Sequence, residues 1–288
     1  MRSSAGLIKR FLSNAISKKT QKVPPTQNLT SEFFEHIQHQ VYGDSRKIDK
    51  VVVNVTLDAE TQKPVLVNRN VSTPFHCLTH ISKQVAENAV LVEVEPSVGE
   101  NYICCVHQPI EDQARITKID FQTTSYTDIL NAAYWRSCGI ATGAILKESF
   151  YPELLVDFNV ENNVEDGFFS VNVSDLQNIS YDELTTINSF GKKFLKEGHP
   201  FECINVPTHI AEENSLDCKL LVRLGRHVFA ASGPVIQSTA QIGQYKLVQA
   251  KPRNNSVQVS GVSLPFAQPT TSYSWGLIVK NASNMCRK

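Results

Sequence analysis

DILNAAYWRSCGIATGAILKESF, residues 128–150, is a long segment of helical character, and it predicts where the larger part of the fold begins. Gly139 and Gly143 each lower the helix propensity by about 1 kcal/mol relative to Ala. Small residues at this spacing favour close packing against another element. We therefore expect a packed helix that opens an α+β domain over residues 122–288.

Upstream of this helix, the sequence changes to strand character. VVVNVTL (51–57) and PVLVN (64–68) flank DAETQK (58–63), which predicts two antiparallel strands joined by a turn. AVLVEV (89–94) and RITKIDF (115–121) predict two further strands. Between the two pairs of strands we expect one helix.

That helix is expected to begin after Thr73, which is a candidate N-cap, with Pro74 at the first helical position. Its apolar face would carry Phe75, Leu78, Ile81 and Val85. Strands, one helix and further strands within about 70 residues fit a small β-grasp domain, so we place such a domain at 51–121.

The amino-terminal 50 residues form two segments. Residues 1–22 hold six basic residues and no acidic one, and their apolar residues can share one helical face, as in a mitochondrial transit peptide. Residues 23–50 form an extension in which SEFFEHIQHQ (31–40) predicts a short helix capped by Ser31.

Downstream of the long helix, Ser180 and Glu183 form a capping box that opens a helix, and Gly198 ends it. Strand-like segments follow, with turn residues beside them: LLVRL (220–224), HVFAAS (227–232) and YKLVQA (245–250). This order continues the predicted α+β domain.

Composition excludes several classes of protein. Apolar residues make up 41% and charged residues 19%, and no apolar run approaches the roughly 18 residues of a membrane helix. The seven cysteines are an odd number with no CxxC, so a disulfide framework or zinc finger is not expected; Cys104 and Cys105 should point to opposite faces of a strand. Walker A, GxGxxG and GxSxG motifs are missing from the sequence.

His76 and His80 stand at i and i+4, but residue 77 is Cys and no third ligand follows at a recognisable spacing. We interpret them as a packed or solvent-facing pair, and expect no metal and no cofactor.

The charge balance changes once residues 1–22 are removed, because 22 basic residues then face 28 acidic ones, a net charge of about −6. Proteins that coat nucleic acid usually carry the opposite sign. Any contact with RNA is therefore expected from local basic patches. The candidates are Lys192, Lys193, Lys196, Arg223, Arg226, Lys280, Arg287 and Lys288.

Two stretches resemble threonyl-tRNA synthetases. Residues 70–99, NVSTPFHCLTHISKQVAENAVLVEVEPSVG, with QPIEDQARITKIDF (108–121), are similar to the TGS domain of that family, where a Thr-Pro opens the helix. AYWRSCGIATGAILKESF (133–150) resembles the helix that opens its editing domain. HVFAASGPVIQS (227–238) and SGVSLPF (260–266) resemble later segments of the same domain.

The residues that carry out editing do not match. The family's His-x-x-x-His motif falls on Arg136 and Ile140, and its Cys and second-motif His fall on Ala231 and Val235. Hydrolysis of a mischarged aminoacyl ester needs groups that position and deprotonate a water. Arg136 stays protonated near neutral pH, and the other three side chains cannot titrate. The resemblance therefore implies a degenerate site without catalysis.

The chain ends soon after the editing-like segment, which implies that it lacks the aminoacylation and anticodon-binding domains. This layout, with AYWRSC (133–138) and GVSLP (261–265), resembles a family of mitochondrial large-ribosomal-subunit proteins. The resemblance implies a structural role in the matrix, with other large-subunit proteins and rRNA as partners and no membrane contact. The alternative is a free-standing tRNA-binding adaptor or editing factor. Near the carboxyl end, Tyr273 and Trp275 are either exposed residues that anchor a partner or part of the core.

Overall fold

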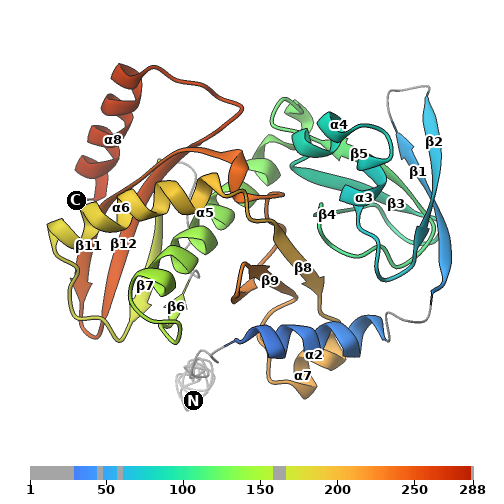
Figure 1. Ribbon diagram of the computed structural model, residues 1–288, viewed down its shortest axis with the longest axis horizontal. Coiled ribbons are helices and arrows are strands. Elements are labelled where there is room, and N and C mark those ends of the chain that lie inside the picture. The colour runs from blue at the N-terminus through green and yellow to red at the C-terminus, as the bar shows by residue number, and fades with distance from the viewer. Residues whose placement is uncertain (1–28, 44–47, 57–60, 158–166, 287–288) are drawn as a thin grey trace, which may run out of the picture.

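The computed structural model describes residues 29–43, 48–56, 61–157 and 167–286 of the chain (Figure 1). The expected transit peptide at 1–22 lies outside these residues. The described part is a mixture of helices and three β-sheets, which confirms the α+β class.

The first sheet has five strands in the order β2-β1-β5-β3-β4. Its strands are β1 (Lys50–Thr56), β2 (Gln62–Asn68), β3 (Leu91–Pro96), β4 (Tyr102–Cys105) and β5 (Ala114–Ile119). β1 and β2 pair antiparallel as expected, whereas β1 and β5 pair parallel at the centre of the sheet. β3 pairs antiparallel with both β4 and β5, so the connection over residues 106–113 crosses from the edge strand β4 to β5 on the other side of β3.

The helix expected after Thr73 is two short helices, α3 (Pro74–Thr79) and α4 (Lys83–Asn88). Thr73 is the N-cap of α3 as expected, and its backbone N–H donates to His76 Nδ1 at 3.1 Å. Ser82 adopts extended backbone and becomes the N-cap of α4, which interrupts the helix. The expected single helix is therefore wrong in its continuity.

The helix in the amino-terminal extension is α2 (Ser31–Tyr42). Its N-cap is Thr30, whose Oγ1 accepts from Phe33 N at 3.2 Å, and not Ser31. Ser31 is the first helical residue, and its hydroxyl donates to the backbone oxygen of Arg226 at 3.0 Å. Figure 1 shows α2 beside α7 (Thr208–Glu213), far along the chain.

The rest of the chain forms two smaller antiparallel sheets around α5 (Thr127–Ser149). The three-stranded sheet has the order β10-β9-β8, with β8 (Phe201–Asn205), β9 (Leu220–Leu224) and β10 (His227–Ala231). The four-stranded sheet has the order β11-β12-β7-β6, with β6 (Val156–Asp157), β7 (Phe169–Ser174), β11 (Ile242–Arg253) and β12 (Ser256–Pro265). Both sheets contact α5.

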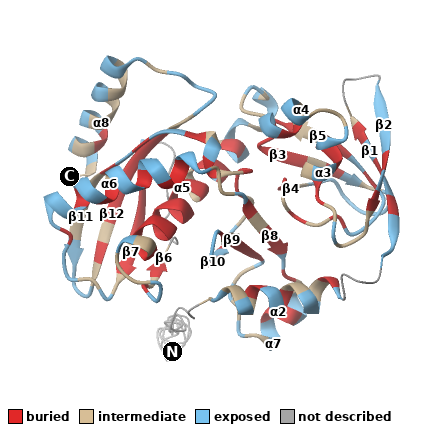
Figure 2. Cartoon of the chain, viewed as in Figure 1, coloured by how far each residue is buried: buried red, intermediate tan, exposed pale blue. Residues whose placement is uncertain are grey.

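The long helix predicted from the sequence is confirmed as α5 and is buried along most of its length, as the red ribbon in Figure 2 shows. The helix opened by the Ser180–Glu183 capping box is α6 (Tyr181–Lys196). Ser180 N donates to Glu183 Oε2 at 2.7 Å, and Glu183 N donates to Ser180 Oγ at 3.3 Å. Gly198 follows with φ of +73°, the left-handed conformation that suits a helix end.

Two short 3-10 helices, Thr124–Tyr126 and Thr239–Gln241, precede α5 and β11. The last helix, α8 (Ser272–Cys286), was not foreseen from the sequence, although Thr271 accepts a hydrogen bond from Ser274 N as an N-cap would. It lies against β11 and β12 and buries only Ala282. No helix within the described ranges has the length and apolar content needed to cross a membrane.

Three apolar cores hold these elements together. Cys104 belongs to the core between the first sheet and the helices α3 and α4, whereas Cys105 belongs to the large core around α5. This confirms that their thiols face opposite sides of β4. Leu91 and Ile119 also join the large core. The outer face of the first sheet therefore packs on the second part of the chain.

Candidate degenerate editing site

Arg136 lies on α5 and reaches the loop after β10. Its Nη1 donates to the backbone oxygen of Pro234, and its Nε donates to Ser232 Oγ at 3.3 Å. A Cβ added to Gly233 would lie 3.2 Å from the guanidinium carbon, so the glycine lets the group lie flat on the loop. Burial lowers the pKa of Arg136, but guanidinium remains cationic near neutral pH. Arg136 therefore holds the loop and cannot act as a base.

The three motifs that resemble the synthetase editing domain meet at α5. Tyr134 hydrogen-bonds through its hydroxyl to Ser263 Oγ at 2.7 Å, which joins AYWRSC to the GVSLP segment. Arg136 joins the same helix to Gly233 and Pro234. A Cβ on Gly261 would lie 2.5 Å from the Phe169 ring, so this glycine in β12 leaves the space that the ring occupies. Motifs about 100 residues apart thus build one structural unit.

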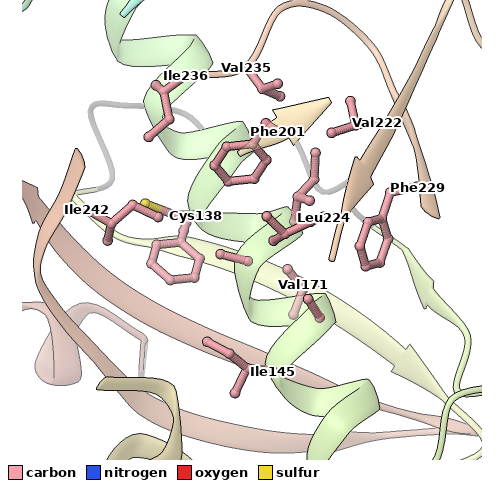
Figure 3. Packing of buried hydrophobic residues seen from close by; sticks show 14 of the residues in the cluster. Cys138, Ile145, Val171, Phe201, Val222, Leu224, Phe229, Val235, Ile236 and Ile242 are labelled. Atoms are coloured by element: carbon pink, nitrogen blue, oxygen red, sulfur yellow. The ribbon is translucent and has the colours of Figure 1, made fainter. Parts of the chain in front are cut away.

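The other three positions where the resemblance would place editing residues are packed into the large core. Ile140 and Val235 are completely buried, and Ala231 is 4% exposed. Figure 3 shows Val235 and Ile236 among the apolar side chains that surround α5. These three side chains carry no group that could bind a metal, move a proton or hold a ribose.

The loop that carries Val235 is fastened from two sides. Val235 N donates to Cys105 Sγ at 3.3 Å, and Ile236 N donates to Ser137 Oγ at 2.9 Å. Cys105 comes from β4 in the first sheet, whereas Ser137 is on α5. Both loop amides donate to side chains of the protein, so the loop is fixed to β4 and to α5.

Three of the histidines, His76, His199 and His227, also have structural partners. His76 accepts the helix-capping hydrogen bond from Thr73 N. His227, 5% exposed, lies 2.8 Å from Glu148 Oε1, and His199 lies 2.7 Å from Glu197 Oε2. Within the described ranges, no three His, Cys, Asp or Glu residues come together in a geometry that could hold a metal ion.

The basic residues proposed to contact RNA differ in their environment. Lys192, Lys193 and Lys196 are exposed on α6, and no ion pair involves them in the described part of the chain. Arg223 pairs with Glu202 at 2.5 Å and lies 4.7 Å above the Phe34 ring. Arg226 pairs with Glu148 through both Nε and Nη2. The charges of these two arginines are therefore already neutralised within the chain.

At the carboxyl end, Lys280 is exposed on α8, whereas Arg287 and Lys288 lie outside the described residues. Tyr273 is 78% exposed and Trp275 is half-buried on the same helix. Neither aromatic residue belongs to an apolar core cluster.

The structure also contains a groove that sequence reasoning missed. It has a volume of about 1080 Å³ and lies between α4 and the carboxyl half of α6, with the segment from Gln237 to Tyr245 as its floor. No sequence pattern could have revealed it, because its walls come from parts of the chain more than 100 residues apart.

Comparison with known proteins supports the resemblance. Large ribosomal subunit protein mL39 of Drosophila melanogaster is 23% identical over 277 residues, covering 86% of this chain and 81% of that protein. Cytoplasmic threonine–tRNA ligase 2 is 21% identical in Homo sapiens and 24% identical in Xenopus tropicalis. The chain resembles both kinds of protein.

The extent of the similarity differs between them. The human and frog ligases match 78% and 61% of this chain, which spans only 29% and 22% of their length. The similarity to mL39 therefore covers most of both proteins, whereas the similarity to the ligases covers a limited part of a longer enzyme. No protein-family profile matches the chain.

Proposed function

We propose that this chain is a non-catalytic protein of the mitochondrial large ribosomal subunit, related to threonyl-tRNA synthetases. The observation that carries the proposal is the extent of its similarity to mL39, 81% of that protein. The basic, acid-free segment 1–22 supports a mitochondrial address and delivery to the matrix.

The state of the degenerate site supports the absence of catalysis. The four positions that resemble editing residues hold a cation that clamps a loop and three apolar side chains, of which two are fully buried. Deacylation needs a base near a bound ester and a space for the terminal ribose. Arg136, Ile140, Ala231 and Val235 provide neither.

We infer that 51–121 is a TGS-like β-grasp domain and that 122–288 is a degenerate editing-like domain. The mixed order β2-β1-β5-β3-β4, with helices between β2 and β3, supports the first assignment. The meeting of three editing-like motifs at α5 supports the second. The extension 23–50 contributes α2, which packs on the second of these domains.

For a chain with a net charge of about −6 after loss of 1–22, we infer that neighbouring large-subunit proteins supply most of the contact area, and that mitochondrial rRNA is touched by local patches. Lys192 and Lys196 on α6 are the patch that we retain, with Lys280 as a second site. Lys193 is exposed on the same helix but does not line the groove beside α6, so we do not retain it. Arg223 and Arg226 are removed as well because carboxylates neutralise them.

Sedimentation tests the proposal. After detergent lysis of mitochondria, we expect the protein to travel with the large subunit through a sucrose gradient. A protein that stays at the top of the gradient would contradict the ribosomal role and favour the free-standing tRNA-binding adaptor.

The editing alternative has a separate test. Purified protein is incubated with mischarged threonine tRNA, and the release of the amino acid is compared with that of a boiled control. We expect equal rates, and turnover above the control would show that other residues have taken over deacylation.

A further inference from the structure

The groove beside α6 combines a basic wall with aromatic rings. Lys192 and Lys196 both line it and lie four residues apart on one face of α6, whereas Lys193 does not line it. All three lysines are exposed. The chain therefore contains a natural internal comparison between two lysines on the groove and one beside it.

The charge of the basic wall is not neutralised from across the groove. Among the described residues that line it, Glu87 is the one carboxylate, and its Oε1 lies 3.6 Å from Lys83 Nζ. His107 also lines the groove, and burial lowers its pKa to about 4, so it is neutral at pH 7. Lys192 and Lys196 thus present two positive charges to any occupant, which favours an anion.

The remaining surface suits flat apolar groups. The rings of Phe75 and His107 have centroids 4.8 Å apart, and Phe121 also lines the groove. Phe266 also lines the groove, and this residue is 75% exposed. A Cβ on Gly243 would lie 2.7 Å from the Phe266 backbone, so this glycine allows the close approach that sets Phe266 there.

We propose that this groove binds unpaired RNA, with a splayed base against Phe266 and the flanking phosphates on Lys192 and Lys196. Resting on the proposed ribosomal function, this assigns the rRNA contact to single-stranded rRNA. Single-stranded nucleic acid is bound by aromatic platforms together with basic grooves. In an A-form duplex the bases are stacked and paired, so they cannot enter such a groove.

The groove is separate from the degenerate editing site. Arg136, Ile140, Ala231 and Val235 do not line the groove. Its volume of about 1080 Å³ is slightly above the roughly 300–1,000 Å³ of small-ligand pockets, which gives room for a base with its sugar and phosphates.

Fluorescence anisotropy of the purified chain without residues 1–22, the form proposed to act on the ribosome, tests the proposal. The probe is a labelled 12-nucleotide single-stranded RNA, titrated at several salt concentrations. The double variant Lys192→Gln/Lys196→Gln should weaken binding about 10-fold and reduce the salt slope by ~1.4, at about 0.7 per phosphate contact. The matched variant Lys193→Gln should change the dissociation constant less than about 2-fold.

The aromatic part has its own matched pair. Phe266→Ser should weaken binding at least about 5-fold, because stacking on one base contributes about 1–3 kcal/mol. Tyr273→Ser changes an equally exposed ring on α8, outside the groove, and should leave binding unchanged. All these side chains are exposed, so far-UV circular dichroism and thermal unfolding should match those of the unmodified protein.

Three results would overturn the proposal. They are no binding of single-stranded RNA, equal binding of a duplex of the same sequence, or equal losses from Lys193→Gln and the double variant. The gradient experiment distinguishes the two levels. If the protein travels with the large subunit but fails these binding tests, only the assignment of RNA to the groove is contradicted. If it binds RNA but does not sediment with the subunit, the proposed ribosomal role is contradicted.

Discussion

Ile140 shows why a histidine at a single position of α5 would not create a working site. Its side chain is fully buried in the large core around α5. A histidine there would place a polar ring among apolar groups with no designed partner, which costs about 1–3 kcal/mol in addition to the lost apolar packing.

We therefore expect Ile140→His to lower the free energy of unfolding by about 3 kcal/mol or more and to produce no deacylation. Urea denaturation measures the change. Ile129→His is the matched control, because Ile129 lies on the same helix and is 40% exposed, so its cost should stay near 0.5 kcal/mol. Equal costs for the two variants would show that position 140 is not packed as described.

His107 predicts a pH dependence of stability. Burial, the largest cause, lowers its pKa from 6.5 to about 4, against a smaller opposing effect of Glu202. Between these two values the unfolded chain binds a proton that the folded chain does not, so folding stability falls as the pH falls from about 6.5 to 4.

His107→Phe should remove on the order of 2 kcal/mol of this acid destabilisation, because its ring can still pack on Phe75 and does not titrate. Urea unfolding at pH 7, 5.5 and 4.5 provides the measurement, with His80→Gln at an exposed position as control. An unchanged slope in His107→Phe would exclude His107 as the source. Burial also lowers the pKa of His227, so a smaller dependence of stability on pH should remain in His107→Phe.

At the scale of elements, α2 is the part whose partner was least expected. Phe34 and Ile37 join a core with Leu221 and Val228 from β9 and β10, and Arg223 covers the Phe34 ring. The helix begins at Ser31, before the first strand of the first sheet at Lys50, yet it covers a sheet formed by residues 201–231. α2 therefore packs on the second part of the chain and not on the first sheet, which follows it in the sequence.

Removing the Phe34 side chain tests that role. Phe34→Ala should cost about 3 kcal/mol in urea unfolding, because this ring is 2% exposed and leaves a cavity. Limited proteolysis should also cut within 29–43 sooner than in the unmodified protein. His36→Ala, on the exposed side of α2, is the control and should behave as the unmodified protein. Unchanged stability in Phe34→Ala would mean that α2 is not docked.

For the whole molecule, the large core makes the two parts of the chain interdependent. Val90, Leu91, Cys105 and Ile119 from the first sheet belong to the same core as α5. The amide of Gln241 adds a hydrogen bond to the backbone oxygen of Ala89 at 2.7 Å. Separating the two parts would expose this apolar surface to water.

We therefore expect one cooperative unfolding transition in urea. Trp135 and Trp275, the two tryptophans, both lie after residue 121, so their fluorescence reports on the second part, whereas far-UV circular dichroism reports on the whole chain. The two curves should coincide. A second transition seen only by circular dichroism would show that the first sheet unfolds independently.

The local elements of this protein follow from the amino-acid sequence. The capping box of Ser180 and Glu183, the Thr73–Pro74 helix start, the span of α5 and the pairing of β1 with β2 all follow from neighbouring residues, and the structure confirms them. The motifs that resemble synthetases were also readable, because a motif is a local pattern; comparison with known proteins supports that resemblance.

How distant segments meet is visible in the three-dimensional structure and not in the sequence. The structure pairs Arg223 and Arg226 with carboxylates, docks α2 on a remote sheet, breaks the helix at Ser82, and forms the groove beside α6. It also buries Ile140 and Val235, which the sequence identified as altered positions without showing that they are packed. Burial and ion pairing depend on which surfaces come together, and contacts between residues far apart in the chain leave no mark in the spacing of neighbouring residues.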